Sequence, residues 1–249
     1  MSTTNPRSKD CLVFAHRGAN TEAMENTQEA FDKALTYTID GIETDAQLSR
    51  DEVIVLWHDR FLNKLGFANK RVDDFNYHEL KSLRFPQSGN SGFMTLEAFL
   101  AAYRSRCQLL IEVKNRDWEP VSRHKIKIQQ TLNMIGQNHG QHIFVSSFNL
   151  DSLVYAHHCS PKFPLIYNLE TKQSIIEAQQ ILTAKPFLHG LCLPIETLNQ
   201  AIVDLLRDHN KCIAVYTCNS DEEINKALQL DVDILISDYP HKALMMRNL

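Results

Sequence analysis

Short runs of apolar residues recur along the whole chain, separated by longer polar stretches. The runs carry β-branched and aliphatic residues at consecutive positions, which is typical of strands in a parallel sheet that is covered on both faces. We expect eight strands, at residues 12–15, 41–46, 109–114, 143–147, 165–168, 190–194, 212–217 and 234–237.

The segments between these runs place apolar residues three and four positions apart, as on the buried face of an amphipathic helix. We expect helices at residues 30–35, 96–103, 126–135, 150–156, 175–182, 198–206, 224–230 and 240–246. The first helix has a visible start, because Asn26 is a good N-cap residue and Glu29, three positions later, would complete a capping box.

Eight strands alternating with eight helices predict a (β/α)8 TIM barrel, formed by residues 1–249 as a single domain. An open doubly wound sheet is the competing architecture. Residues 53–57 are expected to extend the second strand, and about residues 59–93 form a small insertion before the second helix, ending in a turn at 90–92. This insertion lies on the face where barrel loops build active sites.

The chain of 249 residues has a net charge of −4, which argues against a general nucleic-acid surface. Its apolar stretches are shorter than the roughly 20 residues that span a bilayer, so we expect no integral membrane association. Residues 1–10 are polar and contain no apolar signal core, and a cytoplasmic protein is therefore expected. None of the six cysteines forms a CxxC pair, which favours buried thiols in a reducing compartment over a zinc ribbon.

Charged residues stand at the ends of the first strands. In a strand, residues i and i+2 point to the same side, so Glu43 shares a face with Asp45, and Glu112 shares a face with Lys114. Three carboxylates at one barrel mouth would repel one another and take up protons, and a divalent cation removes that conflict. Oxygen ligands favour Mg²⁺ or Ca²⁺ over Zn²⁺. The alternative is that each acid caps a helix or pairs with a surface lysine.

The basic residues and histidines of the same clusters complete a site for a phosphate ester. Arg17 offers a fork of donors that suits phosphate oxygens, and Lys114 adds a second cation. With one divalent metal, the cluster keeps one net positive charge, which a phosphodiester would neutralise. His16 and His58 can exchange protons near neutral pH, as in-line displacement at phosphorus requires.

These residues, in this order, resemble the glycerophosphodiester phosphodiesterase family over nearly the whole chain. The motifs are His16-Arg17-Gly18, Glu25-Asn26-Thr27, Glu43-x-Asp45, His58-Asp59, Glu112-x-Lys114, Ser146-Ser147-Phe148 and Ser237-Asp238-Tyr239-Pro240. The resemblance implies the barrel with its small insertion and one divalent cation on the three carboxylates. It also implies His16 and His58 as the catalytic acid–base pair, with Arg17 and Lys114 binding the substrate phosphate.

The implied substrates are small glycerophosphodiesters such as glycerophosphocholine and glycerophosphoethanolamine, which yield glycerol 3-phosphate and an alcohol. A neighbouring glycerol hydroxyl is implied as the first nucleophile, through a cyclic phosphate that water then opens. The chain departs from the family pattern at Met24, which should affect only loop stiffness, and at residues 49–52, residues 61–66 and Tyr216. The departures in the insertion and on the rim bear on substrate preference and leave the chemistry unchanged.

Two alternatives stay open at this point. The first is a phospholipase D-like enzyme that acts on intact lipid, such as a sphingomyelinase D, and the second is a barrel that binds phosphodiesters without catalysis. The retention of both histidines with all three carboxylates favours the hydrolase. A homo-oligomer is compatible with the sequence.

Overall fold

Eight parallel strands close into a barrel in this computed structural model, which describes residues 11–85, 92–136 and 142–249. The polar N-terminal segment and positions 90 and 91 of the expected turn lie outside those ranges. The strand order is β1-β9-β8-β7-β6-β5-β4-β2, and β1 also pairs with β2. That pairing confirms the barrel and excludes the open sheet. The barrel strands are β1 Leu12–His16, β2 Gly41–Leu48, β4 Gln108–Val113, β5 Ile143–Ser147, β6 Leu165–Asn168, β7 Gly190–Pro194, β8 Cys212–Tyr216 and β9 Ile234–Ser237.

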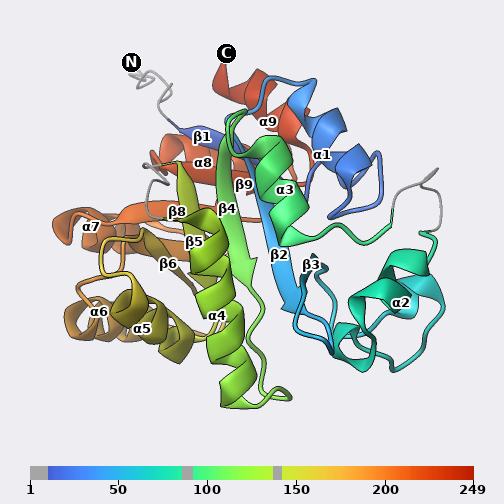
Figure 1. Ribbon diagram of the computed structural model, residues 1–249. Coiled ribbons are helices and arrows are strands. Elements are labelled where there is room, and N and C mark those ends of the chain that lie inside the picture. Colours follow the sequence, from blue (N-terminus) through green and yellow to red (C-terminus); the bar gives the residue numbers. More distant parts are fainter. Residues whose placement is uncertain (1–10, 86–91, 137–141) are drawn as a thin grey trace, which may run out of the picture.

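One helix follows each barrel strand and covers the outside of the barrel, as the 3.6-residue periodicity predicts (Figure 1). The helices are α1 Gln28–Leu35, α3 Leu96–Tyr103, α4 Val121–Ile135, α5 Leu150–Cys159, α6 Ile175–Ala184, α7 Gln200–Asp208, α8 Asp221–Gln229 and α9 Pro240–Arg247. In Figure 1 the arrowheads of β2 and β4 point downward, so the mouth at the strands' C-terminal ends lies at the bottom of the view.

The barrel interior is apolar towards the N-terminal ends of the strands and polar near this mouth. Phe14, Leu110 and Ile166 are completely or almost completely buried within the interior cluster. Gly41 makes room for the Phe14 ring, since a Cβ at this position would lie 2.4 Å from a ring carbon. One step further along the strands, the register aligns His16 with Glu43, and Asp45 with Glu112. The strand register therefore places these four polar side chains at the same height in the barrel, next to the mouth.

The expected insertion after β2 has its own small core. The short strand β3 (Ile54–Leu56) returns antiparallel to β2, and the 3₁₀ turns η1 (Asn63–Leu65) and η2 (Val72–Asp74) and helix α2 (Tyr77–Ser82) follow it. A separate apolar cluster holds these pieces together, formed by Val55, Trp57, Leu62, Val72, Leu80, Phe85 and Phe93. Figure 1 shows this segment beside the lower end of the barrel. The insertion is thus anchored next to the mouth.

The expected cap of the first helix is wrong by one residue. Thr27 is the N-cap of α1, and its hydroxyl accepts a hydrogen bond from the Ala30 amide. Asn26 is buried instead, with a φ of 58°, and its side chain donates to Asp45 at 2.9 Å. The Asn26 side-chain amide binds Asp45 at the barrel mouth, so it does not cap the helix.

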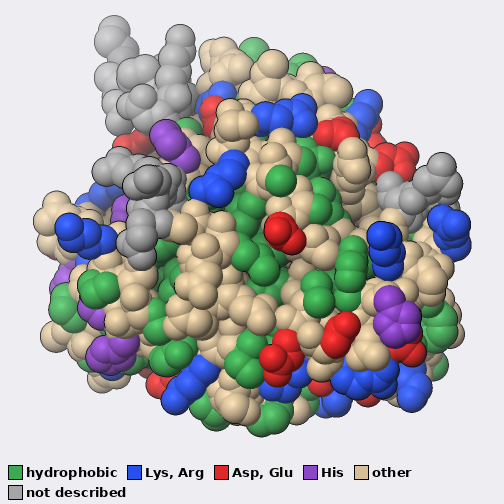
Figure 2. All heavy atoms as spheres, in the orientation of Figure 1, with side chains coloured by type: hydrophobic (Ala, Val, Ile, Leu, Met, Phe, Trp, Pro, Cys, Tyr) green, Lys and Arg blue, Asp and Glu red, His purple; other side chains and the backbone are tan. Residues whose placement is uncertain are grey.

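The cysteines, the helix lengths and the surface charges are those of an ordinary globular protein. All six cysteines are free thiols, and Cys11, Cys192 and Cys218 are buried. Within the described ranges, no helix has both the length and the apolar character needed to cross a bilayer. On the face drawn in Figure 2, acidic and basic side chains lie interspersed and do not form a basic stripe.

Candidate active site

A cavity of about 260 Å³ opens at the C-terminal ends of the barrel strands. It brings together most of the candidate residues from the sequence: His16, Arg17, Glu43, His58, Glu112 and Lys114 line it. Asp45 is 1 % exposed and contacts Arg17 and Lys114 from behind the cavity wall. The seven candidate residues therefore form one cluster.

The three carboxylates lie close enough to share one cation. One oxygen from each of Glu43, Asp45 and Glu112 lies within 4.8 Å of the others, and all three side chains are buried. Burial raises the pKa of Glu43 well above its ordinary value, and the charge of Asp45 adds to this shift. Burial also opposes ionisation of Asp45, but the ammonium of Lys114 and the guanidinium of Arg17 keep its pKa below the ordinary range. The positive charges near the three carboxylates do not offset the burial of Glu43. The set offers only oxygen ligands, which fit a hard divalent cation.

Arg17 sits in a tight turn between β1 and α1. Its φ of 57° lies in the left-handed region, and Gly18 follows with a φ of 84°. A Cβ at Gly18 would lie 2.7 Å from the Ala30 backbone, so a side chain there would force the turn away from α1. The guanidinium lies 2.9 Å from Glu25 and 3.1 Å from Asp45. The turn thus aims Arg17 across the cavity wall towards the acidic group.

Lys114 lies at the centre of the charged cluster. Its ammonium is 2.8 Å from the Asp45 carboxylate and 2.6 Å from the Glu112 carboxylate, and its side chain is 2 % exposed. The Phe148 ring centroid lies 5.9 Å away, which is within reach of a cation–π contact. The same-face pairing with Glu112 is the one expected from the spacing of the two residues.

Each histidine is held by a carboxylate at the same ring nitrogen. Nδ1 of His16 lies 2.6 Å from Asp238, and Nδ1 of His58 lies 2.8 Å from Asp59. A carboxylate at Nδ1 places the proton there and leaves Nε2 to exchange protons. Nε2 of His16 lies 3.9 Å from Glu43, on the side of the acidic group. Burial lowers the pKa of His16, and the hydrogen bond to Asp238 offsets part of that shift.

The positioning role of Asp238 was missed in the sequence. The carboxylate lies 222 residues after His16 and is held by Asn20 and Asn219 as well. Burial tends to raise the pKa of Asp238, but its hydrogen bonds outweigh burial and lower it. Counting every second residue along β9, from Ile234 through Ile236, would have placed Asp238 on the inward face.

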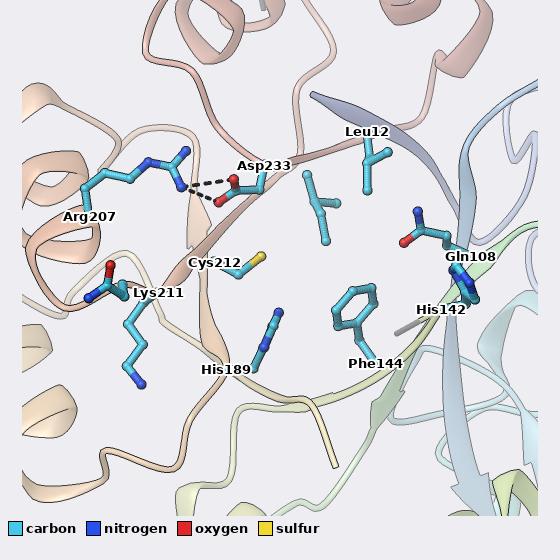
Figure 3. Close-up of a pocket in the computed structure, with 11 residues that line it drawn as sticks. Leu12, Gln108, His142, Phe144, His189, Arg207, Lys211, Cys212 and Asp233 are labelled. Carbon is cyan, nitrogen blue, oxygen red and sulfur yellow. Dashed lines mark hydrogen bonds and ion pairs between the residues drawn. The ribbon is translucent and has the colours of Figure 1, made fainter. Parts of the chain in front are cut away.

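A larger hollow of about 570 Å³ lies at the opposite end of the barrel, around Leu12, Cys212 and Ile234 (Figure 3). Its charged residues are already engaged, since Arg207 pairs with Asp233 at 2.9 Å. Burial raises the pKa of the Cys212 thiol to about 12, so this thiol is not an activated nucleophile. The candidate catalytic residues therefore lie at the mouth that holds the smaller cavity.

Comparison with known proteins agrees with this geometry. A family model described as "Glycerophosphoryl diester phosphodiesterase family" matches residues 16–242. The chain is 30% identical over 247 residues to a glycerophosphodiester phosphodiesterase of Bacillus altitudinis, covering 94% of this chain and 97% of the relative. It is 27% identical over 246 residues to a glycerophosphodiester phosphodiesterase of Bacillus subtilis, covering 92% and 84%.

Solved structures show the same fold. A phosphodiesterase from Oleispira antarctica, in complex with the product sn-glycerol-3-phosphate, superposes with a TM-score of 0.82 at 23% identity, covering 96% of this chain and 97% of that chain. The match of the family model over nearly the whole chain and the similarity to the Bacillus altitudinis enzyme settle the relationship. The chain belongs to the glycerophosphoryl diester phosphodiesterase family and is a phosphoric diester hydrolase.

Proposed function

We propose that this protein hydrolyses small glycerophosphodiesters, such as glycerophosphocholine and glycerophosphoethanolamine, to glycerol 3-phosphate and an alcohol, with one divalent cation. One observation carries the proposal: two histidines, each tied at Nδ1 to a carboxylate, share a cavity with a buried three-carboxylate group. This set of groups combines proton exchange with a possible cation site, and each of these can accelerate the hydrolysis of a phosphodiester.

The cation is proposed to bind Glu43, Asp45 and Glu112, and Mg²⁺ and Ca²⁺ are the two candidates. When bound, it supplies positive charge that offsets the charge on the phosphoryl oxygens. The buried state of the three carboxylates and the raised pKa of Glu43 support this assignment, because positive charge beyond that of Arg17 and Lys114 would favour the ionised form of Glu43.

Arg17 and Lys114 are proposed to bind the substrate phosphate. Both cations already line the cavity, and both are held in place by carboxylates, so they are oriented before the substrate arrives. Pre-oriented donors stabilise a transferring phosphoryl group without the cost of ordering flexible side chains. The Lys114 ammonium lies 2.6 Å from the Glu112 carboxylate, and this ion pair argues against a Schiff-base role.

His16 and His58 are proposed as the acid–base pair. One takes the proton from the attacking oxygen, which is the neighbouring glycerol hydroxyl or water, as the new phosphorus–oxygen bond forms. The other gives a proton to the alcohol oxygen as its bond to phosphorus breaks. If the first product is a cyclic phosphate, the same two groups exchange roles when water opens it. The Nδ1 contacts support these roles, because they free Nε2 on each ring.

The names of the relatives support the same substrate class. Two Bacillus relatives are glycerophosphodiester phosphodiesterases, and the Oleispira antarctica enzyme was solved with sn-glycerol-3-phosphate. A small soluble diester with a glycerol moiety also suits a cavity of about 260 Å³.

A coupled assay for glycerol 3-phosphate tests the proposal. The protein should release glycerol 3-phosphate from glycerophosphocholine or glycerophosphoethanolamine in the presence of Mg²⁺ or Ca²⁺, and lysophosphatidylcholine serves as the lipid comparison. Turnover of the lysolipid alone would favour the phospholipase D-like alternative. Binding of the diesters without release of product would favour the non-catalytic barrel.

A further inference from the structure

A second hollow of about 560 Å³ adjoins the active-site cavity on the His58 side. The two spaces share His58, Arg116, Phe148 and Glu170 in their walls. The outer hollow adds residues from the insertion and from the loop after β4, chiefly Arg60, Asp117 and Trp118. A diester whose phosphate lies in the inner cavity can therefore extend one arm past His58 into this outer space.

Two charged residues of the outer hollow, Arg60 and Asp117, have no ion-pair partner in the part of the chain that the structure describes. The other acids of this wall do form ion pairs. Asp59 lies 3.0 Å from the Lys64 ammonium, and Glu170 lies 2.6 Å from the ammonium of Lys172. The hollow thus keeps one free guanidinium and one free carboxylate.

Aromatic rings fix the direction in which the guanidinium groups can bind. The Arg60 guanidinium lies 4.4 Å from the Trp118 ring centroid, and that of Arg116 lies 5.5 Å from the Phe148 centroid. A guanidinium stacked on a ring uses its face and leaves the N–H groups on its edge free for a carboxylate. The same stacking covers the aromatic faces that would otherwise attract a quaternary ammonium.

We propose that the outer hollow is a head-group subsite that prefers an amino-acid alcohol, such as the serine of glycerophosphoserine. Arg60 binds the head-group carboxylate, and Asp117 binds the ammonium of the same head group. Choline and ethanolamine lack the carboxylate, and a glycerol head group lacks both charges. This inference rests on the proposed hydrolysis of glycerophosphodiesters.

The test compares kcat/KM for glycerophosphodiesters with serine, ethanolamine and glycerol head groups. The wild-type protein should prefer serine to ethanolamine by about three- to tenfold, as expected for a charge-assisted hydrogen bond from an exposed arginine. Arg60→Gln should abolish that preference and leave the rate on the glycerol head group unchanged. Asp117→Asn should slow turnover of the serine and ethanolamine substrates and spare the glycerol one.

Arg84→Gln is the matched control, because Arg84 is an exposed arginine of the insertion that lines neither the active-site cavity nor the outer hollow. It should keep the wild-type ratio. Equal rates on serine and ethanolamine in the wild type, or a ratio that Arg60→Gln leaves unchanged, would overturn the subsite while the hydrolase stands. No release of glycerol 3-phosphate from any of the three substrates would reject the proposed function and the subsite with it.

Discussion

Asp238→Asn is the substitution that most directly probes the proposed proton transfer at His16. The carboxylate accepts the Nδ1 proton of His16 at 2.6 Å, and Asn219 donates to its other oxygen at 2.7 Å. Asn20 donates to the oxygen that faces Nδ1, and Asn219 donates to the other oxygen, so an amide, which has only one oxygen, loses one of these contacts whichever way it turns. In either orientation the neutral amide holds the His16 ring and its Nδ1 proton less firmly than the carboxylate does.

The size of the effect follows from this one contact. A hydrogen bond to a charged group contributes about 1.5–3 kcal/mol. At 1.36 kcal/mol for each factor of ten in rate, kcat should fall by about 10- to 150-fold. Since the Asp238 contact raises the pKa of His16 against burial, its loss should also move the protonation of His16 to lower pH. The limb of the pH–rate profile that reports this group should shift in the same direction.

Steady-state kinetics with glycerophosphoethanolamine, together with a thermal melt, measures both effects. Asp221→Asn is the matched control, because Asp221 is an exposed aspartate of α8 that does not line the active-site cavity, and it should leave kcat unchanged. A kcat for Asp238→Asn within about twofold of the wild type, in a protein that melts normally, would refute the reasoning.

Four further substitutions separate the other roles. Glu43→Gln should weaken binding of the divalent cation at least about tenfold, as measured by calorimetry. The melting temperature should change little, because burial already disfavours the charged form of Glu43. An unchanged affinity would exclude Glu43 as a ligand. His16→Ala and His58→Ala should each lower kcat by about 10²–10⁴-fold, and a nitrophenyl leaving group should rescue only the variant that lacks the acid; near wild-type turnover in both would refute the pair. Lys127→Met should destabilise the fold by about 3–5 kcal/mol, because it leaves Glu119, now 2.7 Å from the Lys127 ammonium, as a buried charge without that partner. Calorimetry should then show a melting temperature lower by about 6–20 °C, and an unchanged value would contradict this account of the pair.

The barrel could be predicted because its strands are buried on both faces and its helices on one. Runs of apolar residues indicate the buried strands, and apolar residues three and four positions apart indicate the helices. Helix α3, for example, spans Leu96–Tyr103, as its apolar pattern predicts. The acidic group followed from the same logic, since Glu43 and Asp45 are two residues apart in one strand.

The cap of α1 and the supports of the histidines depend on contacts that local sequence does not encode. Asn26 and Thr27 are both good N-cap residues. Asn26 donates its hydrogen bond to Asp45, and Thr27 therefore caps the helix. Asp238 reaches His16 only because β9 closes against β1. The outer hollow needs the insertion to fold back over the loop after β4, where Arg60 meets Trp118.

The most direct test of the central claim is glycerol 3-phosphate release before and after removal of divalent cations. Three buried carboxylates whose oxygens lie within 4.8 Å of one another could hold one cation, and the proposed mechanism uses that cation together with the two histidines. The account predicts that EDTA abolishes turnover of glycerophosphoethanolamine and that added Mg²⁺ or Ca²⁺ restores it. Full turnover in the presence of excess chelator, by protein shown to hold no metal, would contradict the account.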